Sequence, residues 1–152
     1  MRTHTTTRRV AGPWSLATSR AFWEGFAPAA LPGHDGTDAL RTAFLVDRDW
    51  SPATVTVEQH GRTARIAVAG PGDLDAAVVQ TARFLSLDVD ATGWPAVGER
   101  DPVVGAAQRQ LPGLRPCGFH SPYEAACWAV LSQRIRITQA AHLGALAERP
   151  AG

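Results

Sequence analysis

Residues 54–69, TVTVEQHGRTARIAVA, contain two runs in which apolar and polar side chains alternate on either side of a glycine. Such alternation is typical of a half-buried β-strand, because successive side chains point to opposite faces. Gly61 lies between the runs and can adopt the positive φ that a tight hairpin turn needs. The stretch therefore predicts a hairpin of strands 54–59 and 62–69, with His60-Gly61 as its turn.

The segments on both sides extend the hairpin into a larger unit. A third strand is predicted over residues 39–47, where Leu40, Phe44 and Val46 share one face. A helix follows the hairpin, with Asp73 as its N-cap and its end near Leu87. Its apolar residues recur at helical spacing and predict one buried stripe.

The start of the chain supplies a further strand and helix. Residues 14–18 alternate in the manner of a strand, and residues 19–26 predict a short helix capped by Ser19. Residues 1–12 are polar and are expected to be a flexible leader. The first 87 residues then have the order β-α-β-β-β-α, which predicts an α+β unit with helices on one face of an antiparallel sheet.

Helical signals dominate after residue 90. A helix is predicted over 101–111, with Asp101 as its cap. The Ser-Pro-Tyr-Glu stretch at 121–124 is a capping box, in which the serine side chain accepts from a backbone amide and Glu124 reaches back to the Ser121 amide. The helix that it opens is expected to run through Arg134, and another helix is expected over about 138–148.

The two last helices carry more apolar surface than the first 87 residues can cover. Each large apolar side chain contributes about 1.5–3 kcal/mol when fully buried. We therefore expect the covering surface to come from another chain or from a C-terminal portion that is not in this sequence. The side chains concerned are Trp128, Leu131, Ile135, Ile137, Leu143 and Leu146.

Composition excludes several classes of protein. The chain has 152 residues, a net charge of +1 and 45% hydrophobic residues, which fits a globular protein. It lacks an apolar run of roughly 18 residues, and its polar start lacks the core of a signal peptide, so we expect a cytoplasmic protein without a membrane partner. All 15 basic residues are Arg, balanced by 14 acidic ones, which excludes a polycationic tail.

Metal chemistry finds little support in the sequence. Cys117 and Cys127 lie ten residues apart and are expected to be buried thiols. The five histidines share no ligand spacing, so we expect loop or exposed histidines rather than a metal site. Neither a metal nor an organic cofactor is predicted.

The predicted order β-α-β-β-β-α is followed by two further segments, 121–124 (SPYE) and 129–135 (AVLSQRI). In these features the chain resembles the AlkA type of DNA-3-methyladenine glycosylase II, in the helix-hairpin-helix glycosylase superfamily. The resemblance covers about residues 13–146, which match only the front half of the family. It implies a TATA-binding-protein-like α+β domain over 13–90 and an incomplete helical glycosylase domain over 91–152.

The resemblance also implies roles for particular residues. The segment with Gln133, Arg134 and Arg136 would contact double-stranded DNA that carries alkylated bases. The alternatives are a polar helix end for Gln133 and Arg134 and a solvated side chain for Arg136. The position of the wedge that fills the gap left by a flipped base falls on Arg134, where the family often has an apolar residue. A guanidinium can fill such a gap by stacking and by bonding to base edges. Phe22 is the nearest match to an aromatic residue that lines the base pocket, and packing in the core is the alternative for this side chain.

The same resemblance exposes an absence. The family's Leu-Pro-Gly-Ile-Gly-like turn and its catalytic Asp have no counterpart after Thr138 in this sequence. No catalytic residue is therefore assigned, and we expect a truncated glycosylase that is inactive alone. Two alternatives remain open. The chain could be a non-catalytic binding or assembly module whose apolar helices form a homo-oligomer interface, or one half of a split glycosylase.

Overall fold

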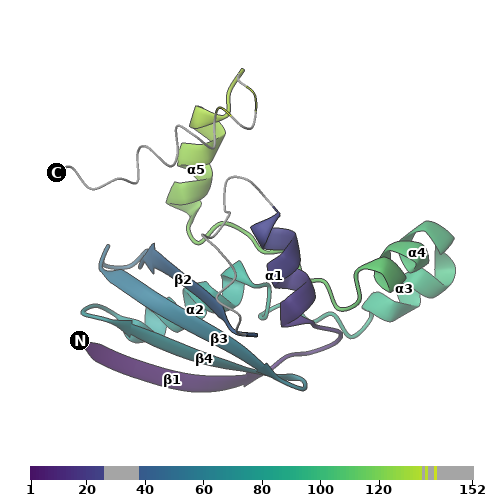
Figure 1. The fold of residues 1–152 in the computed structure, drawn as a ribbon, viewed down its shortest axis with the longest axis horizontal. Coiled ribbons are helices and arrows are strands. Elements are labelled where there is room, and N and C mark those ends of the chain that lie inside the picture. Colours follow the sequence, from purple (N-terminus) through teal and green to yellow (C-terminus); the bar gives the residue numbers. More distant parts are fainter. Residues whose placement is uncertain (26–37, 135, 137–138, 140–152) are drawn as a thin grey trace.

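The computed structural model describes residues 1–25, 38–134, 136 and 139 (Figure 1). Its first elements follow the order β1-α1-β2-β3-β4-α2, which is the predicted α+β order, but the first strand is formed by residues 2–9 and not by residues 14–18. The strands are β1 Arg2–Arg9, β2 Leu40–Leu45, β3 Pro52–His60 and β4 Thr63–Gly70. The helices are α1 Leu16–Glu24, α2 Leu74–Phe84, α3 Trp94–Arg100, α4 Pro102–Gln110 and α5 Pro122–Leu131.

The strands form one antiparallel sheet in the order β1-β4-β3-β2. The predicted hairpin of β3 and β4 is confirmed, but its turn is one residue later than expected. His60 pairs with Thr63, so that Gly61 and Arg62 form the turn. Gly61 has a φ of 59°, the left-handed conformation expected of the glycine.

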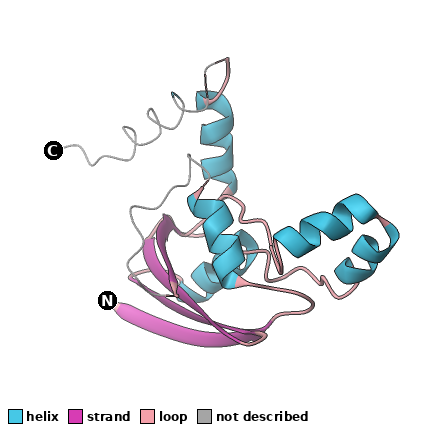
Figure 2. Cartoon of the chain, turned by 45° about the vertical axis from the view of Figure 1, so that its right-hand side comes forward, coloured by secondary structure: helices cyan, strands magenta, loops and turns pink. Residues whose placement is uncertain are grey.

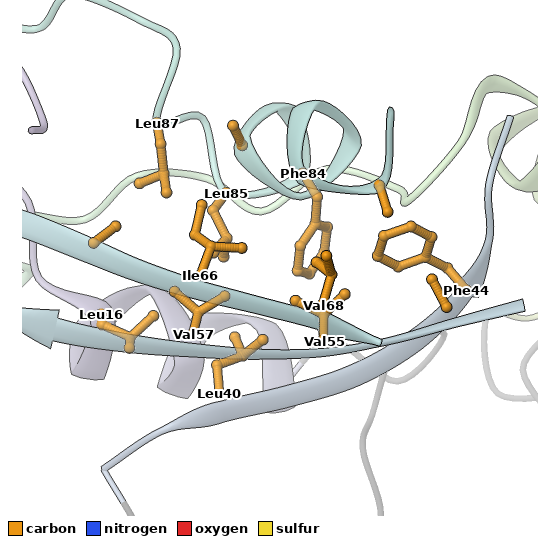
Figure 3. Packing of buried hydrophobic residues seen from close by; sticks show 14 of the residues in the cluster. Leu16, Leu40, Phe44, Val55, Val57, Ile66, Val68, Phe84, Leu85 and Leu87 are labelled. Atoms are coloured by element: carbon orange, nitrogen blue, oxygen red, sulfur yellow. The ribbon is translucent and has the colours of Figure 1, made fainter. Parts of the chain in front are cut away.

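The core lies on one face of this sheet. Leu40, Val57 and Ile66 lie in one row across β2, β3 and β4, and all three are fully buried. Figure 3 shows Phe84 and Leu85, at the end of α2, over this row and its neighbours. Alternate strand residues face away from the core and are exposed or half-buried. The alternation read from the sequence thus identified the buried face correctly.

Both helices of the α/β unit cover the same face of the sheet. Leu16 and Trp23 of α1 belong to the same buried cluster as Phe84 of α2 and the strand residues. The rings of Trp23 and Phe84 meet edge to face, with their centroids 4.9 Å apart. The prediction of helices on one face of an antiparallel sheet is confirmed.

The prediction of a flexible leader at residues 1–12 is wrong. Residues 2–9 form β1, which pairs with β4 along its whole length, from Arg2 opposite Gly70 to Arg9 opposite Thr63. The strand lies at the sheet edge, and only Thr6 is even partly buried, so its sequence shows no apolar alternation. The β-branched threonines suit an exposed strand, and this preference was the available signal.

The boundary of α1 also differs from the prediction. Residues 14–18 do not form a strand; the helix begins at Leu16, after Ser15 as its N-cap. The Ser15 side chain accepts a hydrogen bond of 3.1 Å from the Thr18 amide. Ser19, the expected cap, is instead fully buried inside the helix and accepts from the Arg115 amide. The end of the predicted helix, Phe26, lies outside the described residues.

Helix α2 begins as predicted and ends earlier. The Asp73 carboxylate caps it by accepting from the Ala76 amide at 2.9 Å. The helix stops at Phe84 because Ser86 adopts a left-handed φ of 52°. Leu87 is nevertheless 2% exposed, so the turn after the helix still packs into the core.

Two short helices form a hairpin beside the α/β unit (Figure 1). Asp101 caps α4 as predicted, and its carboxylate accepts from the Val103 and Val104 amides. The preceding α3 was not predicted. The two helices approach so closely that a Cβ on Gly105 would lie 2.6 Å from the carbonyl oxygen of Gly98. None of the helices in the described part of the chain is long and apolar enough to cross a membrane.

Arg115 joins the helical part to the α/β unit. Its side chain is 3% exposed and donates to the carbonyls of Pro13, Ser86 and Val89, the last two at 2.7 Å. It also donates to the carbonyl of Ala11. A single buried guanidinium thereby holds the chain before α1 against the chain after α2.

Candidate functional site

The capping box at the start of α5 builds the first part of the site. The Ser121 side chain accepts from the Glu124 amide at 3.0 Å, as predicted. Glu124 reaches further back than predicted, because its carboxylate accepts from the His120 amide at 2.7 Å. The capping box therefore fastens His120 to the first turn of α5.

Helix α5 extends away from the sheet in both views (Figures 1 and 2). None of its residues is buried, although Glu124 is its only charged residue. Val130 is 67% exposed, and Trp128 and Leu131 are only partly covered. The apolar surface of α5 is thus left uncovered by the described residues, as the sequence predicted.

The predicted DNA-contacting segment follows directly after α5. The helix ends at Leu131 rather than at Arg134, and Ser132 is its C-cap. Arg134 has a φ of 58°, which costs a side-chain-bearing residue about 1–2 kcal/mol. Gln133, Arg134 and Arg136 are all exposed. The turn therefore presents one amide and two guanidinium side chains to the solvent.

The structure does not bring Phe22 to that segment. Phe22 lies on α1 and is 47% exposed, while its neighbour Trp23 is buried in the core. The turn with Arg134 follows the end of α5 that is distant from the sheet (Figures 1 and 2). Within the described residues, an expected pocket residue and an expected wedge residue therefore lie in separate places.

A site that the sequence did not predict surrounds His120. Its imidazole stacks on Phe84 and Phe44, with centroids 4.4 and 5.3 Å apart, and meets Trp23 edge to face. Its Nε2 lies 2.9 Å from the Thr42 hydroxyl, and its Nδ1 lies 3.1 Å from the Glu124 carboxylate. The side chain is only 12% exposed. Hydroxyl, imidazole and carboxylate are therefore joined in one chain of contacts.

The electrostatics of this cluster favour an ionised carboxylate. Burial acts to raise the pKa of Glu124, but the hydrogen bonds from His120, together with its charge when the ring is protonated, outweigh it and lower that pKa below its ordinary value of 4.5. Thr42 is 8% exposed, so its hydroxyl is not open to a substrate in the manner of a nucleophile. The cluster is arranged to hold two parts of the protein together.

His120 lies in the loop before α5, which fits the expectation of loop or exposed histidines, but the burial of its side chain was not predicted. His4 and His60, by contrast, have side chains that are 44% and 65% exposed. The sequence contained one signal for the contact between His120 and Glu124, namely their spacing. His120 lies four residues before Glu124 and directly before the helix cap. Its aromatic neighbours come from distant parts of the sequence and could not be recognised there.

Other candidate sites are less well supported. Among the described residues, no group of three or more His, Cys, Asp or Glu side chains is placed to hold a metal ion. Cys117 and Cys127 are free and only partly buried, and burial raises the pKa of Cys117 to about 12. The described part of the surface includes two open hollows of about 820 and 480 Å³. Neither of them is lined by the expected site residues Phe22, Gln133, Arg134 and Arg136.

The chain is similar in structure to a 3-methyladenine DNA glycosylase from Archaeoglobus fulgidus, with a TM-score of 0.68 and 16% sequence identity. The similarity covers 92% of this chain and 48% of that protein, so the chain spans about half of its length. No protein-family profile matches the chain. No curated protein matches it either. The comparison shows a glycosylase-like fold.

Proposed function

We propose that this chain is the front part of an AlkA-like DNA glycosylase that removes alkylated bases in base-excision repair. The observation that carries the proposal is the similarity of fold over 92% of the chain to a 3-methyladenine DNA glycosylase. The proposal includes a TATA-binding-protein-like arrangement in the α/β unit, a boundary to the helical domain near residue 90, and a location in the cytoplasm. Its partner is double-stranded DNA.

The turn after α5 is the proposed contact with DNA. Arg134 has a left-handed backbone conformation, and the residue is exposed. Because it is exposed, its guanidinium can enter a gap in the base stack. Gln133 would bond to base edges, and Arg136 to a phosphate. Phe22 is retained as a proposed wall of the base pocket, since almost half of its side chain is exposed.

Residues 1–152 by themselves are expected not to excise a base. Glycosylases stabilise the positive charge that develops on the sugar by placing a carboxylate beside it. The proposed DNA-contacting turn holds no carboxylate, and Glu148 is the only acidic residue after Glu124. Release of free 3-methyladenine from methylated DNA by the purified 152-residue chain would contradict this expectation.

Binding to DNA is tested by fluorescence anisotropy with two duplexes, one intact and one with an abasic-site analogue. We expect weak binding, with a Kd of about 10⁻⁴–10⁻⁶ M. Arg134→Ala should weaken binding to the abasic duplex by about tenfold and remove the preference for it. Arg136→Ala should weaken binding to both duplexes equally and reduce the salt dependence.

Arg83→Ala is the matched control, because Arg83 is an exposed arginine on α2 and lies far from the turn in sequence. It should change neither affinity. Equal losses from Arg83→Ala and Arg134→Ala would mean that the chain binds DNA only through its general charge, and would overturn the assignment of the turn.

A second candidate function is favoured by the uncovered apolar face of α5, on which Tyr123 is 60% and Val130 is 67% exposed. A non-catalytic module would bury this face between two copies of the chain. Size-exclusion chromatography with light scattering separates the two functions. A folded dimer that Val130→Asp dissociates supports the module, while glycosylase activity restored by a second polypeptide supports a split enzyme.

A further inference from the structure

Among the described residues, helix α5 has little attachment to the rest of the chain apart from its first turn. It has no buried residue, and no strand or other helix of the described chain packs extensively along it. Tyr123 meets Trp50 edge to face at 5.1 Å, but both side chains are more than half exposed. The direction in which α5 leaves the α/β unit must therefore be set at its start.

The imidazole of His120 contacts three different elements at that point. Phe44 belongs to β2, Phe84 to α2 and Trp23 to α1, and the ring centroids of all three lie within 5.7 Å of that of the imidazole. The ring lies nearly parallel to those of Phe44 and Phe84, at 26° and 23°, and almost perpendicular to that of Trp23, at 81°. These contacts fix the plane of the imidazole in the α/β unit.

Two hydrogen-bond contacts fix the rotation of the ring within that plane. Nε2 contacts the Thr42 hydroxyl on β2, and Nδ1 contacts the Glu124 carboxylate on α5. The same carboxylate oxygen accepts from the His120 amide. The imidazole, which the α/β unit holds in place, thus contacts a side chain in the first turn of α5. The orientation of the ring therefore determines the position of that first turn.

The chemistry of the partners decides which nitrogen carries the proton. An ionised carboxylate only accepts hydrogen bonds, so Nδ1 must be a donor toward Glu124. A hydroxyl both donates and accepts, so Thr42 can donate to an unprotonated Nε2. In the neutral ring, both contacts are satisfied only with the proton on Nδ1.

We propose that His120, held as the Nδ1–H tautomer between Glu124 and Thr42, is the positioning residue that sets the direction of α5 relative to the α/β unit. This role is independent of what the chain binds. Its consequence for Gln133 and Arg134, which follow α5, rests on the proposed function.

The tautomer is tested by two-dimensional NMR of the ¹⁵N-labelled 152-residue chain, in which long-range couplings distinguish protonated from unprotonated ring nitrogens. We expect His120 to show a protonated Nδ1 and an unprotonated Nε2. Thr42→Val should shift the Nε2 signal alone, because the Glu124 contact remains. An Nε2–H tautomer in the unmodified chain would overturn the proposal. The exposed His60 serves as the reference in the same spectrum.

The direction of α5 is tested by the distance between two spin labels. One label is attached to Cys127 on α5 and the other to the cysteine of Thr7→Cys on β1, in a Cys117→Ser background. His120→Phe keeps a ring of similar shape and removes both polar contacts, so we expect the distance distribution to widen at least twofold. His60→Phe is the matched control and should leave the distribution unchanged.

The same variants without spin labels, labelled with ¹⁵N, report whether the sheet stays folded, through the dispersion of the amide signals of β3 and β4. If His120→Phe disrupts the sheet, Glu124→Leu replaces it, since this change lies outside the core and removes the acceptor of both contacts with His120. The distribution should then widen with an unchanged sheet. An unchanged distribution in whichever variant stays folded would overturn the proposal.

Discussion

The α/β unit and α5 use their apolar residues in opposite ways. In the sheet, apolar side chains on alternate residues form a closed cluster in which Val57 and Ile66 are fully buried. Helix α5 is also rich in apolar residues, yet none of them is buried. The difference shows that apolar content does not itself stabilise a segment, because the contribution comes from the area that neighbouring elements remove from water.

The largest expected effect is a difference in the free energy of unfolding when a β-branched apolar side chain is truncated in the α/β unit and in α5. Ile66→Ala should lower the free energy of unfolding by about 2–5 kcal/mol, because it leaves a cavity in the core. Val130→Ala should change it by less than about 0.5 kcal/mol, because that side chain is mostly exposed. Urea denaturation of both variants measures the difference. Similar losses would show that α5 is covered in solution.

The junction between the two regions is tested at Arg115. Arg115→Met keeps much of the buried aliphatic volume and removes the donors to the carbonyls of Pro13, Ser86 and Val89. We expect a loss of about 2–3 kcal/mol, since buried acceptors are left without partners. Arg109→Met, on an exposed residue of α4, is the control for urea denaturation. A loss below about 0.5 kcal/mol for Arg115→Met would contradict the role of the guanidinium.

A smaller effect is expected in the β3–β4 hairpin. Gly61→Ala should lower the free energy of unfolding by about 1 kcal/mol, because Gly61 has a φ of 59°. A Cβ at this glycine would meet no atom within 4 Å, so the cost is conformational alone. Gly93→Ala, at a glycine with equal space and a φ of −81°, is the matched control and should cost less in the same denaturation experiment.

The smallest effect concerns pH and the first turn of α5. Because the pKa of folded Glu124 is lowered from 4.5, its contribution to stability is complete above that pH and is lost as the pH falls through the folded pKa. The side chain is 37% exposed, so solvent screening limits the effect to less than about 1 kcal/mol. Glu124→Gln should flatten the stability profile below about pH 4.5, measured by thermal unfolding at each pH. An unchanged slope would contradict the shift.

Local patterns predicted the elements whose two faces differ. The buried faces of β2, β3 and β4, the cap of α2 at Asp73 and the cap of α5 at Ser121 follow from side-chain period and from short-range hydrogen bonds. The same reasoning failed for β1, whose residues are exposed except for the partly buried Thr6, and for the start of α1, which is capped by Ser15 and not by the predicted Ser19. There the choice is made by tertiary contacts.

The candidate site divides in the same way. Gln133 and Arg134 were singled out by resemblance, but they lie in an exposed turn after α5 and not in the predicted helix. The cluster around His120 was missed, because Thr42, Phe44 and Phe84 lie 78, 76 and 36 residues before it in the sequence. The sequence by itself determined β2, β3 and β4, the caps of α2, α4 and α5, and the apolar surface of α5. Only the tertiary structure decided that His120 is buried, because that requires three distant elements to meet around one ring.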